Sequence, residues 1–169
     1  MFKKKVPPPP PSPAAVQVLT PDYLIQGYLE DLEAWPFSGL LLTGVRFEPV
    51  GALQPPVATA ARWFLPEFSP VLVAIPGDPV SQARTQELAG DSDYALPAEL
   101  YVGPYRIQGM VLRADDETDA EALTDTLAEY ALVQDASIDC LLPGTRLPRL
   151  HAPFVVVRTG HLLQGFVPL

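Results

Sequence analysis

The sequence contains few of the residues on which most catalytic and metal sites depend. Cys140 is its only cysteine, and His151 and His161 are its only histidines. A single cysteine excludes an intramolecular disulfide and a cysteine-based zinc site, and the apolar residues around Cys140 favour a small hydrophobic role over a nucleophilic one. Neither histidine has a nucleophile or a metal-ligand spacing beside it, and no glycine-rich phosphate loop or hydrolase motif occurs. We therefore expect no enzymatic activity, no cofactor and no metal site.

Long apolar runs and an excess of positive charge are also missing. No stretch approaches the roughly 18 apolar residues that a membrane span needs. The lysines at positions 3–5 precede prolines rather than the apolar core of a signal peptide, so we expect a cytoplasmic protein. The net charge is −9, and residues 85–169 carry thirteen acidic against five basic side chains. Because affinity for nucleic acids comes largely from Lys and Arg contacts with phosphates, nucleic acid is disfavoured as a partner.

Proline, in contrast, is abundant, with 21 residues in a chain of 169. The prolines at positions 7–11 favour an extended polyproline helix, which makes no internal hydrogen bonds. We interpret residues 1–15 as a proline-rich disordered tail that acts as a spacer, and a ligand for an aromatic groove is the alternative. The prolines scattered through the body argue against a helical bundle and for short strands joined by turns.

Several segments in the first half of the sequence recur in the same order in the second half, which predicts a tandem repeat. Residues 23–27 (YLIQG) recur as residues 105–109 (YRIQG), an offset of 82. Two further segments align in the same order: residues 41–47 with 132–138, at an offset of 91, and residues 65–73 with 147–156, at an offset of 82 that becomes 83. We therefore expect a first unit at 16–80, a linker at 81–96 and a second unit at 97–169.

Each unit is predicted to consist of strands. Ile25 and Gly27 share one face of the first motif, and Ile107 and Gly109 share the same face of the second, which is the period of a half-buried strand. A glycine on the inward face of both copies predicts a sharp bend or a close backbone approach. The further segments expected to form regular structure are strands at 40–47, 71–75, 132–140, 154–158 and 162–167 and one short helix at 119–130. The first unit lacks a counterpart of the last strand, so we expect another segment or chain to complete its edge.

A bent strand with a central glycine, inside a short all-β unit of about five strands, resembles the Sm-like and SH3-type small barrels. Together with the Leu-Thr-Asp-x-Leu step at residues 123–127 and a closing Val-rich strand, the pattern is also similar to uncharacterised bacterial domains of unknown function. The resemblance implies an all-β fold with one short helix, built as two tandem small five-stranded β-barrel-like repeats. It also implies RNA contacts through an Asp- or Asn-bearing loop and an Arg-Gly step, but the chain has no asparagine and only Arg158-Thr159-Gly160 near a last strand.

We predict a non-enzymatic protein-interaction or scaffold module, because small barrels packed on each other leave edge strands that pair, hide or recruit a partner. The expected partner is another protein or a second copy of the chain. The alternative is an Sm-like ligand- or RNA-binding regulator. If they are exposed rather than part of the core, the predicted contact residues are Trp35, Phe37, Trp63 and Phe64.

Overall fold

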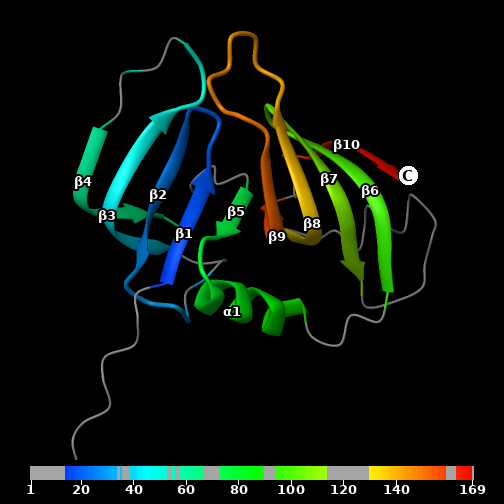
Figure 1. Ribbon diagram of the computed structural model, residues 1–169, viewed down its shortest axis with the longest axis horizontal. Coiled ribbons are helices and arrows are strands. Elements are labelled where there is room, and N and C mark those ends of the chain that lie inside the picture. Colours follow the sequence, from blue (N-terminus) through cyan, green and yellow to red (C-terminus); the bar gives the residue numbers. More distant parts are fainter. Residues whose placement is uncertain are drawn as a thin grey trace, which may run out of the picture.

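The computed structural model describes residues 14–33, 35, 39–52, 55, 58–66, 73–89, 94–113, 130–158 and 163–168. Most of them lie in strands, and they include one helix, so the predicted mostly β class is confirmed (Figure 1). The elements in chain order are β1 (Ala14–Leu19), β2 (Tyr23–Leu29), β3 (Leu40–Pro49), β4 (Ala58–Leu65), β5 (Val73–Pro76), α1 (Pro79–Ala89), β6 (Tyr94–Val102), β7 (Tyr105–Arg113), β8 (Tyr130–Cys140), β9 (Leu150–Arg158) and β10 (Leu163–Pro168).

The strands form one antiparallel sheet in the order β10-β6-β7-β8-β9-β5-β1-β2-β3-β4. β1 to β5 make up a first half and β6 to β10 a second half, and the order of strands is the same in both. In each half the last strand in sequence pairs with the first one. The halves are joined where β5 pairs with β9, in the register Val73–Val157 and Ala74–Val156.

The same register also recurs in the two halves, so positions can be matched. Ile25 pairs with Phe47 in the first half, and Ile107 pairs with Ile138 in the second. We call such positions corresponding. The pairs used below, each with its first-half member first, are Trp63 and Val155, Phe64 and Val156, Leu65 and Val157, Val73 and Gly165, Ala74 and Phe166, and Pro76 and Pro168.

A β-bulge bends the third strand of each half at corresponding places. Gly44 and Asp135 have φ angles of 58° and 52°, which is the left-handed conformation of the first residue in such a bulge. Gly27 and Gly109 lie across from the bulges, where the ladder skips a pair. A Cβ atom on Gly27 would lie 3.2 Å from the carbonyl oxygen of Thr43, so the backbones approach closely there, as the glycine pattern predicted.

Two apolar cores lie on opposite faces of the sheet where the halves meet. In β5, Ala74 packs in the core of the first half and the next residue, Ile75, in that of the second. In β9, Val156 packs in the first core, whereas Val155 and Val157 pack in the second. Since successive side chains of a strand point to opposite faces, both faces of the joint are buried.

The predicted pair of five-stranded barrels is wrong, because the described strands form a single open sheet. The prediction that the first unit lacks a last strand is also wrong, since β5 pairs with β1. β5 therefore corresponds to β10, and β9 corresponds to β4. The alignment of residues 65–73 with 147–156 is wrong for this reason.

The helix is not where the sequence pattern placed it. α1 lies mostly within the expected linker at 81–96, packs on β1, β5 and β9, and crosses the end of the first half (Figure 1). Its start is fixed by Asp78, whose carboxylate accepts hydrogen bonds from the amides of Val80 and Ser81 at 2.7 and 3.0 Å, with Pro79 in the first turn. Of the predicted helix at 119–130, Tyr130 begins β8 and the remainder lies outside the described residues.

Candidate functional site

β4 is an edge strand whose side chains are largely exposed. It pairs with β3, and no other described strand lies along its second edge. Trp63 is 43% exposed and Phe64 is 57% exposed, and Leu65 is the only buried residue of the strand. Natural proteins rarely leave a long apolar edge strand uncovered, because its unpaired amides and carbonyls can recruit another chain.

A mostly apolar pocket of about 530 Å³ opens beside this edge, on the face that carries the first core. It is framed by side chains of β2, β3 and β4, the turn after β1 and the loop before β4. We call it the Trp63 pocket, and its main lining residues are Tyr23, Ile25, Phe47, Pro55, Trp63 and Leu65.

Three aromatic rings hold one wall of the pocket in place. Phe47 packs edge-to-face against Trp63, with ring centroids 5.0 Å apart and an interplanar angle of 79°. On its other side Phe47 packs edge-to-face against Tyr23, at 6.2 Å and 86°. Such pairs add about 0.5–1.5 kcal/mol beyond area burial, so the wall is formed before any partner arrives.

In the second half the corresponding place is filled. Tyr105, Ile107, Ile138, Val155 and Val157 are all buried there. They pack in one core with four residues of the first half, namely Leu19, Leu24, Val50 and Ile75. The same set of corresponding positions thus lines an open pocket in the first half and lies buried at the contact between the halves in the second half.

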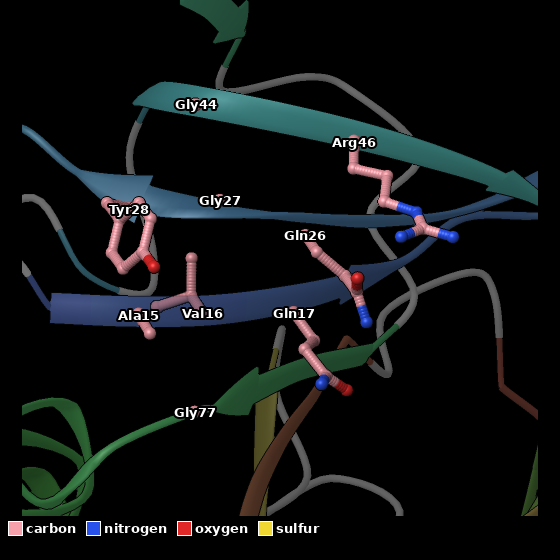
Figure 2. Close-up of a pocket in the computed structure, with 9 residues that line it drawn as sticks. All are labelled: Ala15, Val16, Gln17, Gln26, Gly27, Tyr28, Gly44, Arg46 and Gly77. Carbon is pink, nitrogen blue, oxygen red and sulfur yellow. The ribbon is translucent and has the colours of Figure 1, made fainter. Parts of the chain in front are cut away.

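A second, polar hollow of about 340 Å³ lies on the opposite face of the first half. Figure 2 shows Gln17, Gln26 and Arg46 toward one end of it and Tyr28 toward the other. The Nε atom of Arg46 lies 3.0 Å from the Oε1 atom of Glu48, so its charge is already balanced by a neighbouring carboxylate. The hollow can accept hydrogen bonds from a small polar ligand and donate to one, but it offers little net positive charge.

The charged side chains of the sheet are mostly paired with one another. Arg62 of β4 donates to Glu30 from Nε at 2.8 Å and from a terminal nitrogen at 2.5 Å. In the second half, Arg149 and Arg106 both donate to Asp139, and these hydrogen bonds lower the pKa of Asp139 to about 2. These pairs shape a surface with mixed charge rather than a basic groove.

The structure separates the predicted contact residues. Trp63 and Phe64 are exposed on the two faces of β4. Trp35 is 1% exposed, and its Nε1 donates to Thr85 Oγ1 of α1 at 2.9 Å, so it belongs to the core and does not meet the condition of exposure set for a contact residue. The sequence pattern did not predict α1, and so it could not predict that the indole of Trp35 is buried against this helix. Phe37 lies outside the described residues.

The residues of the repeat signature lie inside rather than at a site. Ile25 is buried and lines the Trp63 pocket, and Ile107 is buried in the second core. Gly27 and Gly109 lie in β2 and β7 opposite the bulges. Sequence reasoning missed Tyr23 and Phe47, although an aromatic residue at the start of one strand and another near the end of the next is a signal that could have found them.

The described part of the chain holds no cluster of three or more His, Cys, Asp or Glu side chains suited to a metal ion. None of its helices has the length and apolar character that crossing a membrane requires.

Comparison with known proteins gives no match: no protein-family model, no curated protein and no solved structure is significantly similar to this chain.

Proposed function

We propose that this protein is a non-enzymatic interaction module that binds a protein partner at β4 and the Trp63 pocket. The partner adds a strand to the free edge of β4 and inserts apolar side chains into the pocket. Main-chain hydrogen bonds along the edge would supply affinity, and the pocket would supply specificity.

One observation carries this proposal. The edge strand β4 exposes Trp63 at an open apolar pocket and Phe64 on its other face. In the corresponding strand β9, Val156 and Val157 pair with β5, and Val155, Val156 and Val157 are all buried. Aromatic side chains that become buried at the centre of an interface are the usual source of its binding energy. The matching order and register of the two halves further support a duplicated unit of which one copy keeps its binding edge free.

Site-specific photo-crosslinking tests the proposal. p-Benzoylphenylalanine replaces Phe64 in one variant and, as a matched control, Tyr28 in another, since Tyr28 is also exposed but lies on the central strand β2. We expect protein adducts from position 64 and none from position 28. The absence of adducts at position 64, in a variant with the circular dichroism spectrum of the wild type, would refute the proposal.

The second candidate is a ligand- or RNA-binding regulator, and the polar hollow with Gln17, Gln26 and Arg46 is the observation that favours it. Filter binding at low salt tests the RNA version, because electrostatic binding is strongest there. Retention of RNA that Arg46→Ala abolishes would favour this candidate over the first one.

A further inference from the structure

The joint between the two halves shows how this fold binds a copy of itself. β5 of the first half pairs with β9 of the second half. The hydroxyl of Tyr105 donates to the carbonyl oxygen of Thr20 across the joint at 2.6 Å. The carbonyl oxygen of Val50 accepts from Thr145 Oγ1 at 2.9 Å and from the amide of Arg146 at 3.1 Å. The halves are therefore joined by paired strands, by these polar contacts and by apolar residues of the first half that pack into the core of the second. We call these apolar residues the plug residues: Leu19, Leu24, Val50 and Ile75.

In terms of corresponding strands, the joint places the fifth strand of one half against the fourth strand of the other. The strands left at the two ends of the sheet are β10, a fifth strand, and β4, a fourth strand. The two end strands of the sheet, β10 and β4, thus correspond to β5 and β9, which pair with each other in the middle of the sheet.

We propose that the protein assembles head to tail with copies of itself, with β10 of one copy pairing antiparallel with β4 of the next. This inference rests on the proposed function and names the partner at the β4 edge. Transfer of the internal register gives Phe166 opposite Phe64 and Gly165 opposite Leu65 of the neighbouring copy.

The exposure of corresponding residues supports a second copy as the occupant. Phe64 is 57% exposed, whereas its counterpart Val156 is 2% exposed at the internal joint. Leu141 and Val50 also correspond, since the amide of Leu141 donates to the carbonyl oxygen of Pro104 as that of Val50 donates to Asp22. Leu141 is 51% exposed, whereas Val50 is fully buried in the second core. Leu141 therefore corresponds to a plug residue, Val50, but is exposed to solvent. The Trp63 pocket corresponds to the part of the second core that Val50 fills, so we expect Leu141 to enter the Trp63 pocket of the next copy.

The contact between copies is expected to be weaker than the internal joint. The buried residues Leu19 and Leu24 correspond to Tyr101 and Arg106, which are polar and only partly buried. Less apolar surface would be removed from water between copies than at the internal joint, so the assembly should be reversible and depend on concentration. Because two different surfaces meet, the contact is heterologous and gives chains or closed rings rather than a symmetric dimer.

Disulfide trapping in the full-length chain tests the arrangement. Cys140→Ser removes the native thiol, and Phe64→Cys and Phe166→Cys are then introduced in separate chains. Residues directly opposite in an antiparallel pair have Cα atoms roughly 4.5–5.5 Å apart, within the range that a disulfide spans. We expect cross-linked dimers when the two variants are mixed and none from either variant alone. Cross-linking of Phe64→Cys with itself would overturn the proposal, because it requires β4 to pair with β4.

Sedimentation of the wild type across a concentration series gives an independent readout. We expect association that Leu141→Asp weakens roughly tenfold to a hundredfold, as for a central apolar contact. A monomer at all concentrations, together with no mixed disulfide, would overturn the inference. In that case an adduct of position 64 with a different protein would leave the proposed function standing, whereas no adduct at all would remove both.

Discussion

Gly109→Ala is expected to destabilise the protein much more than Gly27→Ala, although the two glycines occupy corresponding positions. Both lie opposite a β-bulge, in β7 and β2. The difference comes from how closely the neighbouring strand approaches. A Cβ atom on Gly109 would lie 2.6 Å from Val133 Cγ1 and 2.7 Å from the carbonyl oxygen of Gln134, whereas the nearest atom to one on Gly27 is at 3.2 Å.

These distances set the size of the effect. Ordinary van der Waals contacts of a Cβ atom begin at 3.4 Å, so at Gly109 a backbone carbonyl must move, while at Gly27 a few tenths of an ångström suffice. Overpacking of a dense interior costs about 1–3 kcal/mol, and a rigid backbone neighbour belongs at the upper end. We expect a loss of about 3 kcal/mol for Gly109→Ala. For Gly27→Ala we expect about 1 kcal/mol or less, because the lower entropy of the unfolded alanine chain offsets part of the strain.

Urea unfolding followed by far-UV circular dichroism measures both free energies of unfolding on the same scale. A conserved m-value for the two variants would show that the same structure unfolds in each. Equal losses for the two variants, or a larger loss for Gly27→Ala, would refute the reasoning, because it derives the asymmetry from the two sets of distances alone.

Three further substitutions test other parts of the structure. Thr85→Val should lower the free energy of unfolding by about 1–3 kcal/mol, since it leaves the buried indole N–H of Trp35 without its acceptor. Urea unfolding measures this loss, and an unchanged free energy of unfolding would contradict the prediction. Asp135→Gly should raise the free energy of unfolding by up to about 1 kcal/mol, because glycine adopts the φ of 52° there without steric cost; a lower midpoint would argue against that reading of the bulge. Asp139 has its pKa lowered from 3.8 to about 2, so its ion pairs stabilise the fold above pH 3.8 and this contribution is lost as the pH falls toward 2. The stability difference between wild type and Asp139→Asn, measured by thermal melts over this range, should therefore shrink with falling pH, and a constant difference would contradict it.

Local patterns in the sequence identified many of the strands. The alternation around Ile25 and Ile107 predicted β2 and β7, and the spacing of 91 residues between 41–47 and 132–138 matches the register of β3 and β8. This worked because a strand with one buried face repeats every two residues whatever its partner is. The close approach at Gly27 could be predicted because a glycine on an inward face rarely serves another purpose.

The pattern failed where burial does not alternate. β4 was missed because it is an edge strand with most of its side chains exposed, so its sequence does not alternate between apolar and polar residues. The apolar run before Pro76 and the one before Arg158 were matched with each other, although β5 corresponds to β10. Strands of a joint that are buried on both faces have continuous apolar sequences, and such runs look alike.

The sequence by itself determined the mostly β class and the close approach of the neighbouring strand at Gly27 and Gly109. Only the tertiary structure decided that β5 pairs with β9 across the halves, that α1 buries Trp35, and that Trp63 remains at an open pocket. The physical reason is that every strand edge offers the same amides and carbonyls. Which edges meet depends on side-chain packing between segments far apart in the chain, and that information is spread over both halves rather than written in any local motif.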